Sequence, residues 1–148
     1  MDHAARHTIN MIGILLITHG PLGEHLLASA AHVLGGMQAN ATAMNIAPGD
    51  RADARLAEAR KLIKTIDDGT GVLVLTDIFG ATPANIAGCL LNSAQVEGVT
   101  GVSLPMLVKA LAYRHLPLAE VTAKALEGGA QGQIRIKEDC CHAVEGAS

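Results

Sequence analysis

The chain has 148 residues, 49% of them hydrophobic, and a formal net charge of −3 at pH 7. That length suits one domain with a sizeable core, and that charge argues against a protein that binds the phosphate backbone of nucleic acids. Phe79 and Tyr113 are the only aromatic residues, so base stacking on single-stranded nucleic acid is also disfavoured.

The N-terminal residues and the cysteines indicate where in the cell the protein is located. Residues 1–10 are polar and lack the apolar region of a signal peptide, so we expect a disordered extension. No apolar run approaches the length of a membrane span, so we expect no membrane insertion. Cys89, Cys140 and Cys141 form neither a CxxC pair nor an even framework. Together these features predict a cytoplasmic protein.

The first predicted strand organises the rest of the chain. Residues 12–17 are apolar apart from one glycine and rich in Ile, which is typical of a strand buried on both faces of a sheet. The run ends in residues 18–21, Thr-His-Gly-Pro, and apolar residues then recur at helical spacing over 22–34. His19 therefore follows a buried strand directly, at the end where open α/β sheets bind ligands.

A second strand, a second helix and a third strand follow in the sequence. Residues 41–47 are predicted to form a short strand, and the turn Pro48-Gly49-Asp50 offers Asp50 as the cap of a helix closed by residues 67–69. Residues 71–76 form a second strongly apolar run, terminated by Asp77.

The remaining elements are less regular. Thr82 and Pro83 are predicted to be the N-cap and the first residue of a third helix. After it we expect a strand within 96–104, a helix over 106–113, another helical stretch over 117–129, an edge strand over 131–137 and a loose tail over 138–148.

The order of elements predicts the fold. Alternating strands and helices indicate a doubly wound, mostly parallel four-stranded sheet with helices on both faces, in a single domain over residues 11–137. The flavodoxin-like strand order 2-1-3-4 is a common solution for such a sheet, and we expect it here. In that order the first and third strands are neighbours. His19 and Asp77 are therefore expected side by side at the switch point.

An imidazole beside a carboxylate is a nucleophile with a fixed tautomer. Asp77 would hold the proton on one ring nitrogen of His19 and leave the lone pair of the other nitrogen exposed. The helix starts after residues 20–21 and at 82–83 offer N–H groups suited to a phosphoryl group. A bound nucleotide has no support, because neither a Walker A motif nor GxGxxG is present.

Two metal hypotheses are weaker. A zinc site at His19 and Asp77 lacks a third ligand. The cluster Cys140-Cys141-His142 lies in a polar tail, where an incidental exposed group is the simpler interpretation.

Three motifs together resemble a known family. They are THG after the first strand, DxFGxTPxNxA over residues 77–87 and GVSLPML over 101–107, and the turn at 48–50 matches as well. The chain, from about residue 11 to about residue 129, resembles the enzyme IIA domain of the mannose/fructose class of the bacterial phosphotransferase system (PTS). It departs from the pattern at Ser103, where the family usually carries Asn.

The resemblance implies a role for each matching residue. His19 would carry the phosphoryl group, Asp77 would orient it, and no metal or other cofactor would be needed. The expected phosphate-binding residues are Thr18, Gly20, Gly80, Ala81 and Thr82. Guesses for a partner-docking surface are Pro21, Leu22 and Phe79.

The resemblance also implies partners. The donor would be the phosphocarrier HPr or its nitrogen-branch relative, and the acceptor a IIB component. A homodimer is expected, with residues 131–137 as a strand exchanged between subunits. No linker and IIB domain follow, so we expect a stand-alone IIA protein at most peripheral to a permease.

Alternative functions are a regulatory phosphoprotein of an incomplete or nitrogen-related PTS, and a non-enzymatic module that binds a phosphorylated small molecule. The dihydroxyacetone kinase phosphotransfer subunit fits less well, because it lacks the stretch at 77–80.

Overall fold

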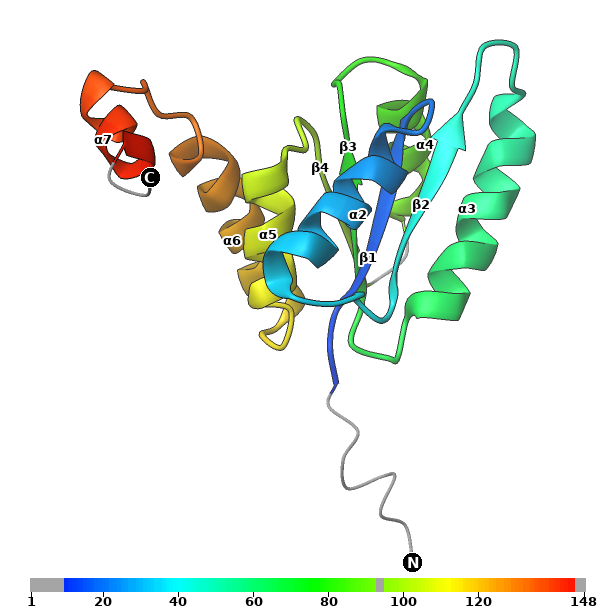
Figure 1. Ribbon diagram of the computed structural model, residues 1–148. Helices are drawn as coiled ribbons and strands as arrows, with labels where there is room; N and C mark the ends of the chain where they lie inside the picture. The colour runs from blue at the N-terminus through cyan, green and yellow to red at the C-terminus, as the bar shows by residue number, and fades with distance from the viewer. Residues whose placement is uncertain (1–9, 93–94, 146–148) are drawn as a thin grey trace, which may run out of the picture.

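A computed structural model describes residues 10–92 and 95–145. Its centre is a parallel sheet of strand order β2-β1-β3-β4 (Figure 1). The strands are β1 (Gly13–His19), β2 (Ala41–Ile46), β3 (Val72–Thr76) and β4 (Val96–Val99). This confirms the flavodoxin-like fold and the strand order predicted from the sequence.

Helices cover both faces of the sheet (Figure 1). One face packs against α2 (Leu22–Leu34), α5 (Leu104–Ala112) and α6 (Leu118–Gln131), and the other against α3 (Ala52–Ile66) and α4 (Thr82–Leu90). Each layer has its own apolar cluster, so the sheet lies between two cores.

Strand β1 is buried because it lies inside the sheet, between β2 and β3. Its side chains alternate between the two cores: Ile14 and Leu16 point to the α2 side, Leu15 and Ile17 to the α3–α4 side. Continued past the apolar run, the same alternation directs Thr18 toward α2 and His19 toward α3 and α4. Thr18 and His19, although adjacent in the sequence, therefore lie on opposite faces of the sheet.

Three helix starts differ from the sequence prediction. Arg51, not Asp50, is the N-cap of α3, because the Asp50 carboxylate instead accepts the N–H of Ala47 within its own turn at 2.8 Å. Ala81 precedes α4, so Thr82 is its first residue. Helix α5 begins at Leu104, two residues before its predicted start.

Ser103 explains that earlier start of α5. It is the N-cap, and its hydroxyl accepts the N–H of Met106 at 3.3 Å. Strand β4 is correspondingly shorter than the predicted 96–104. The departure at Ser103 from the family pattern is therefore accommodated by a capping bond.

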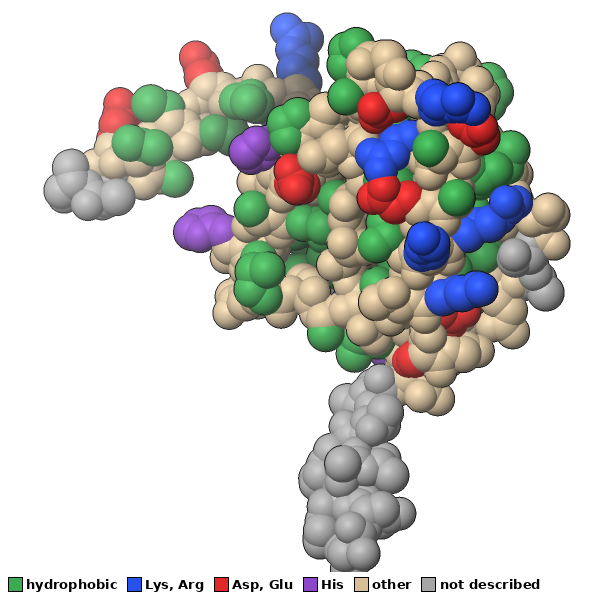
Figure 2. Space-filling view, turned by 90° about the vertical axis from the view of Figure 1, so that its right-hand side faces the viewer, with side chains coloured by type: hydrophobic (Ala, Val, Ile, Leu, Met, Phe, Trp, Pro, Cys, Tyr) green, Lys and Arg blue, Asp and Glu red, His purple; other side chains and the backbone are tan. Residues whose placement is uncertain are grey.

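The segment after α6 also differs from expectation. Helix α6 continues to Gln131, and residues 133–137 join no strand of the described chain, so the edge strand predicted over 131–137 is absent within this subunit. Residues 138–145 are not a loose tail but form a short 3₁₀ turn η1 (Glu138–Cys140) and helix α7 (Cys141–Glu145). This arm projects from the body of the molecule (Figures 1 and 2).

The surface carries charges of both signs. The face over α3 shows Lys and Arg side chains interspersed with Asp and Glu (Figure 2). In the part of the chain that the structure describes, no helix is long and apolar enough to cross a membrane.

Arg114 makes hydrogen bonds at the end of the sheet that lies opposite His19. The side chain is 6% exposed, and its Nε and Nη2 atoms donate to the carbonyls of Ile12 at 3.0 Å and Asn40 at 2.9 Å. Burial lowers the pKa of the guanidinium, and the negative charge of Asp68 partly offsets that effect. One side chain thus holds the starts of β1 and β2.

We expect Arg114→Met to destabilise the protein by about 2–4 kcal/mol, because it removes two hydrogen bonds from a charged donor and leaves the Asn40 carbonyl with only the N–H of Ile14. Urea unfolding at neutral pH measures this difference. The control, Lys61→Met on the exposed side of α3, should change stability by less than about 0.5 kcal/mol. Equal stability of the two variants would show that these bonds contribute little.

Candidate functional site

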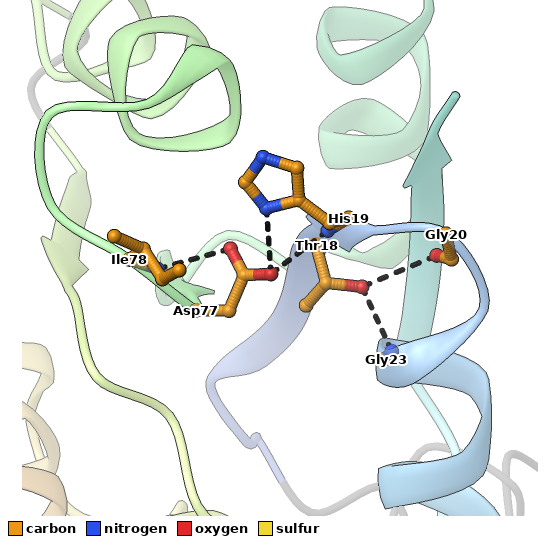
Figure 3. A network of polar contacts seen from close by, with 6 residues as sticks. All are labelled: Thr18, His19, Gly20, Gly23, Asp77 and Ile78. Carbon is orange, nitrogen blue, oxygen red and sulfur yellow. Dashed lines mark hydrogen bonds and ion pairs between the residues drawn. The ribbon is translucent and has the colours of Figure 1, made fainter. Parts of the chain in front are cut away.

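The site lies where β1 and β3 end side by side. His19 is the last residue of β1, and Asp77 follows the last residue of β3. One carboxylate oxygen of Asp77, Oδ2, lies 2.9 Å from Nδ1 of the His19 ring and also accepts the His19 main-chain N–H at 2.9 Å (Figure 3). The structure therefore brings together the two residues that the predicted topology placed at the switch point.

The other oxygen of Asp77 is fixed as well. Oδ1 accepts the main-chain N–H of Ile78 at 3.0 Å (Figure 3). The Asp77 side chain is only 9% exposed, whereas that of His19 is 50% exposed. The carboxylate is thus held from both sides, and the imidazole that it orients is open to an incoming molecule.

These contacts shift the titration of Asp77. Partial burial disfavours the charged carboxylate, but hydrogen bonds from the main chain and ring of His19 outweigh burial and lower the pKa of Asp77. Asp77 is therefore ionised at neutral pH and accepts a hydrogen bond from the protonated Nδ1 of His19. That contact leaves Nε2 as the nitrogen with a free lone pair.

A pocket of about 350 Å³ adjoins the exposed face of His19. Gly20 and Thr82 line it together with residues 46–50 at the end of β2. Helix α4 starts at Thr82 without a side-chain cap. Its first N–H groups have no partner inside the helix, so the start of α4 suits an anion beside the imidazole.

The remaining predicted phosphate-binding residues occupy different places. Ala81 is the N-cap of α4, and Gly80 precedes it with a φ of +85°, a left-handed conformation that suits glycine. Gly80 lines a separate hollow with Phe79, between α4 and β4. Thr18 is fully buried on the opposite side of β1, so its hydroxyl does not face the pocket.

The predicted docking residues all reach solvent around the site. Phe79 is 83% exposed and Leu22 is 42% exposed, and Pro21 is exposed as well. Ile78, which sequence reasoning missed, is 59% exposed beside them. Large apolar side chains in the open next to a half-exposed histidine are typical of a surface that contacts another molecule.

Sequence reasoning also missed the β2 side of the pocket. It interpreted residues 48–50 as a turn but did not place them beside His19. The signal was available, because β2 neighbours β1 and parallel strands bring their following loops to the same edge. The turn is held by Asp50, which bonds Ala47, and by Arg55, which lies 3.8 Å from Asp50 and donates to the carbonyl of Asn45 at 3.1 Å.

The predicted cluster of cysteines and histidine in the tail, and three further histidines, stay apart from the site. Cys140, Cys141 and His142 lie on the exposed arm, and the described residues contain no group of three side chains arranged to hold a metal ion. His25 and His32 are exposed on α2, and His115 stacks near Tyr113 at the far end of α5.

Comparisons with known proteins agree with this fold. The sequence profile of the family described as "PTS system fructose IIA component" matches residues 13–126. The chain is 30% identical over 113 residues to the PTS system fructose-specific EIIA component of Bacillus subtilis (strain 168), covering 75% of this chain and 77% of that protein. This chain belongs to the mannose/fructose IIA family of the PTS.

Two further relatives extend the comparison. The chain is 33% identical over 129 residues to the PTS system mannose-specific EIIAB component of Escherichia coli (strain K12), covering 85% of this chain but only 40% of that protein. The mannose/sorbose specific IIA subunit of the phosphotransferase system from Enterococcus faecalis superposes with a TM-score of 0.77 at 25% identity. That superposition covers 86% of this chain and 96% of the other.

The lowered pKa of Asp77 predicts how the site responds to acid. Because the folded-state pKa lies below the unfolded one, the stabilisation from this carboxylate is present at neutral pH and is lost as the pH falls below about 4. An NMR titration of the Asp77 carboxyl carbon should give a midpoint below that of a free aspartate. His19→Ala should raise this midpoint, since it removes the imidazole contact and keeps the main-chain one. A wild-type midpoint above that of a free aspartate, about 4, would contradict the lowered pKa.

Proposed function

We propose that this protein is a phosphoryl carrier of the PTS, with His19 as the residue that accepts and donates the phosphoryl group. The observation that carries the proposal is the contact of 2.9 Å between Nδ1 of His19 and the buried carboxylate of Asp77. It orients a half-exposed imidazole and leaves Nε2 as the nucleophile.

In the proposed reaction, the phosphoryl group moves from the donor to His19 by nucleophilic displacement at phosphorus. The lone pair of Nε2 on His19 forms a bond to phosphorus while the P–N bond of the donor's phosphohistidine breaks. The electron pair of that bond returns to the donor nitrogen. The proton on Nδ1 stays in place, so the imidazole becomes positively charged as it is phosphorylated, and the Asp77 carboxylate stabilises that charge.

The start of α4 receives the phosphoryl oxygens in this proposal. Thr82 lines the same pocket as His19 and carries both a hydroxyl and a main-chain N–H at the first position of the helix. Among the residues that the structure describes, no Lys or Arg lines that pocket. The charge of the bound phosphoryl group is therefore met by N–H groups and the helix dipole within this chain.

The donor in this proposal is HPr or its nitrogen-branch relative, and the acceptor is a IIB component. Both would dock on the apolar surface of Pro21, Leu22, Ile78 and Phe79 beside His19. All three cysteines are exposed free thiols, which is in keeping with the cytoplasmic location predicted from the sequence.

A reconstituted transfer assay tests the proposal. Phosphoenolpyruvate, enzyme I and HPr are mixed with wild type, His19→Ala, Asp77→Asn or the control His32→Ala, which removes an exposed histidine of α2. Intact mass at alkaline pH should show one added phosphate on wild type and on the control, and none on His19→Ala. Asp77→Asn should accept phosphate more slowly, by roughly 10- to 1000-fold, because the ring loses its orienting charge.

Phosphate on His19→Ala would contradict the assignment of the acceptor. Wild type that stays unmodified with both HPr and its nitrogen-branch relative would contradict the carrier function. Adding IIB then separates transport from regulation, since only a transport component is expected to pass the phosphate onward.

We also propose that the protein is a homodimer joined by its arm. Ile134 and Ile136 are 78% and 83% exposed, and they alternate with polar residues as a half-buried strand would. Strand β4 is at the edge of the sheet, and no described residue pairs with its outer side. A second subunit's residues 133–137 would cover that edge.

The oligomeric state checks this arrangement. Wild type should sediment as a dimer, and the double substitution Ile134→Lys and Ile136→Lys should shift it toward monomer, because lysines cannot be buried against the partner without cost. The matched control, Val33→Lys and Met37→Lys at exposed positions near the end of α2, should remain a dimer. A dimer that survives the arm substitutions would place the interface elsewhere.

A further inference from the structure

The hydroxyl of Thr18 bonds to the main chain on the side of β1 that faces α2. Thr18 is 0% exposed, and Oγ1 accepts the N–H of Gly23 at 2.8 Å and lies 3.5 Å from the carbonyl of Gly20 (Figure 3). Gly23 lies in the first turn of α2, which has no cap from the residue that precedes it. Thr18 therefore caps α2 from within the neighbouring strand.

The start of α2 is pressed against the sheet at this bond. A side chain at Gly23 would place its Cβ 3.1 Å from Cβ of Leu16 and of Ala43, and 3.2 Å from Oγ1 of Thr18. Gly23 is buried, so water cannot replace the hydroxyl as the partner of its N–H. Without that hydroxyl, the first turn of α2 either keeps an unsatisfied N–H or moves.

The turn that carries His19 is held on several sides. Thr18 ties its start to α2, the Gly20 N–H donates to the carbonyl of Ile46 at 2.9 Å, and the His19 N–H donates to Asp77. Gly20 itself has a φ of +57°, a left-handed conformation that suits glycine in a short connection. Movement of α2 therefore shifts the main chain on which the imidazole is mounted.

We infer that Thr18 is a positioning residue for His19 and does not bind the phosphoryl group. By taking the Gly23 N–H it removes one donor from the start of α2, whereas the start of α4 lines the pocket beside His19 and receives the phosphoryl oxygens. By anchoring the turn it keeps the ring against Asp77 with Nε2 toward the pocket. This inference deepens the proposed carrier function and rests on it.

Two substitutions separate the hydroxyl from the shape of the side chain. Thr18→Val keeps the volume and branching and removes the bond to Gly23, whereas Thr18→Ser keeps the bond. The control is Thr122→Val on α6, which removes a hydroxyl bonded to the carbonyl of Leu118 at 2.9 Å, away from the site. Each variant is first shown to be folded at the assay temperature.

The transfer assay from phosphorylated HPr then gives kcat and KM for each variant. Thr18→Val should lower kcat about 10- to 100-fold, because a small misplacement of a reacting group has effects of that size, and leave the KM for HPr within about twofold. Thr18→Ser and Thr122→Val should stay within about threefold of wild type in kcat. A purely structural role for Thr18 would lower stability and leave kcat of the folded variant unchanged, which would overturn the inference.

A second measurement is independent of phosphorylation. In the ¹⁵N spectrum of the His19 ring, wild type should show the proton on Nδ1, and Thr18→Val should show a mixture of the two tautomers as the contact with Asp77 loosens. Thr18→Ser should resemble wild type. An unchanged tautomer in Thr18→Val would overturn the positioning role, whereas unphosphorylated wild type beside a changed tautomer would overturn only the carrier function.

Discussion

The contact between His19 and Asp77 depends on the order of the strands. The two residues are 58 positions apart in the sequence, and they meet because β1 and β3 are paired in parallel, with Ile17 opposite Thr76. Each follows its strand at the same edge of the sheet. A carboxylate that is 9% exposed then accepts hydrogen bonds from both the main chain and the ring of His19. The switch point of the fold thereby fixes the orientation of the imidazole.

The alternation of side chains along β1 places Thr18 and His19 on opposite faces of the sheet, where they have different roles. Thr18 points to the α2 side and engages main-chain groups there, while His19 points to the α3–α4 side, where a pocket and the uncapped start of α4 lie. The two helices that begin beside the site are therefore unequal. Helix α2 is bonded to the strand that precedes it, and the first N–H groups of α4 are left for a ligand.

The surroundings of the site fit a protein that hands a group from one partner to another. The pocket is open, its wall at residues 46–50 is braced by Asp50 and Arg55, and apolar side chains of the 78–79 loop stand in solvent next to His19. A carrier has to meet its donor and its acceptor in turn, so the reacting atom must be reachable while its orientation stays fixed. Half-exposure of His19 against a buried Asp77 meets both requirements.

The sequence by itself determined the fold class, because buried parallel strands appear as apolar runs that alternate with helices. Taken with a strand order that is common in doubly wound sheets, it also predicted the pairing of His19 with Asp77. Local choices that depend on competing hydrogen bonds were decided only in three dimensions. Asp50 bonds Ala47 and does not cap α3, Ser103 starts α5 before Pro105, and Thr18 bonds Gly23 away from the pocket. Each of these side chains had more than one partner within reach along the chain, and only the packed structure shows which one it bonds.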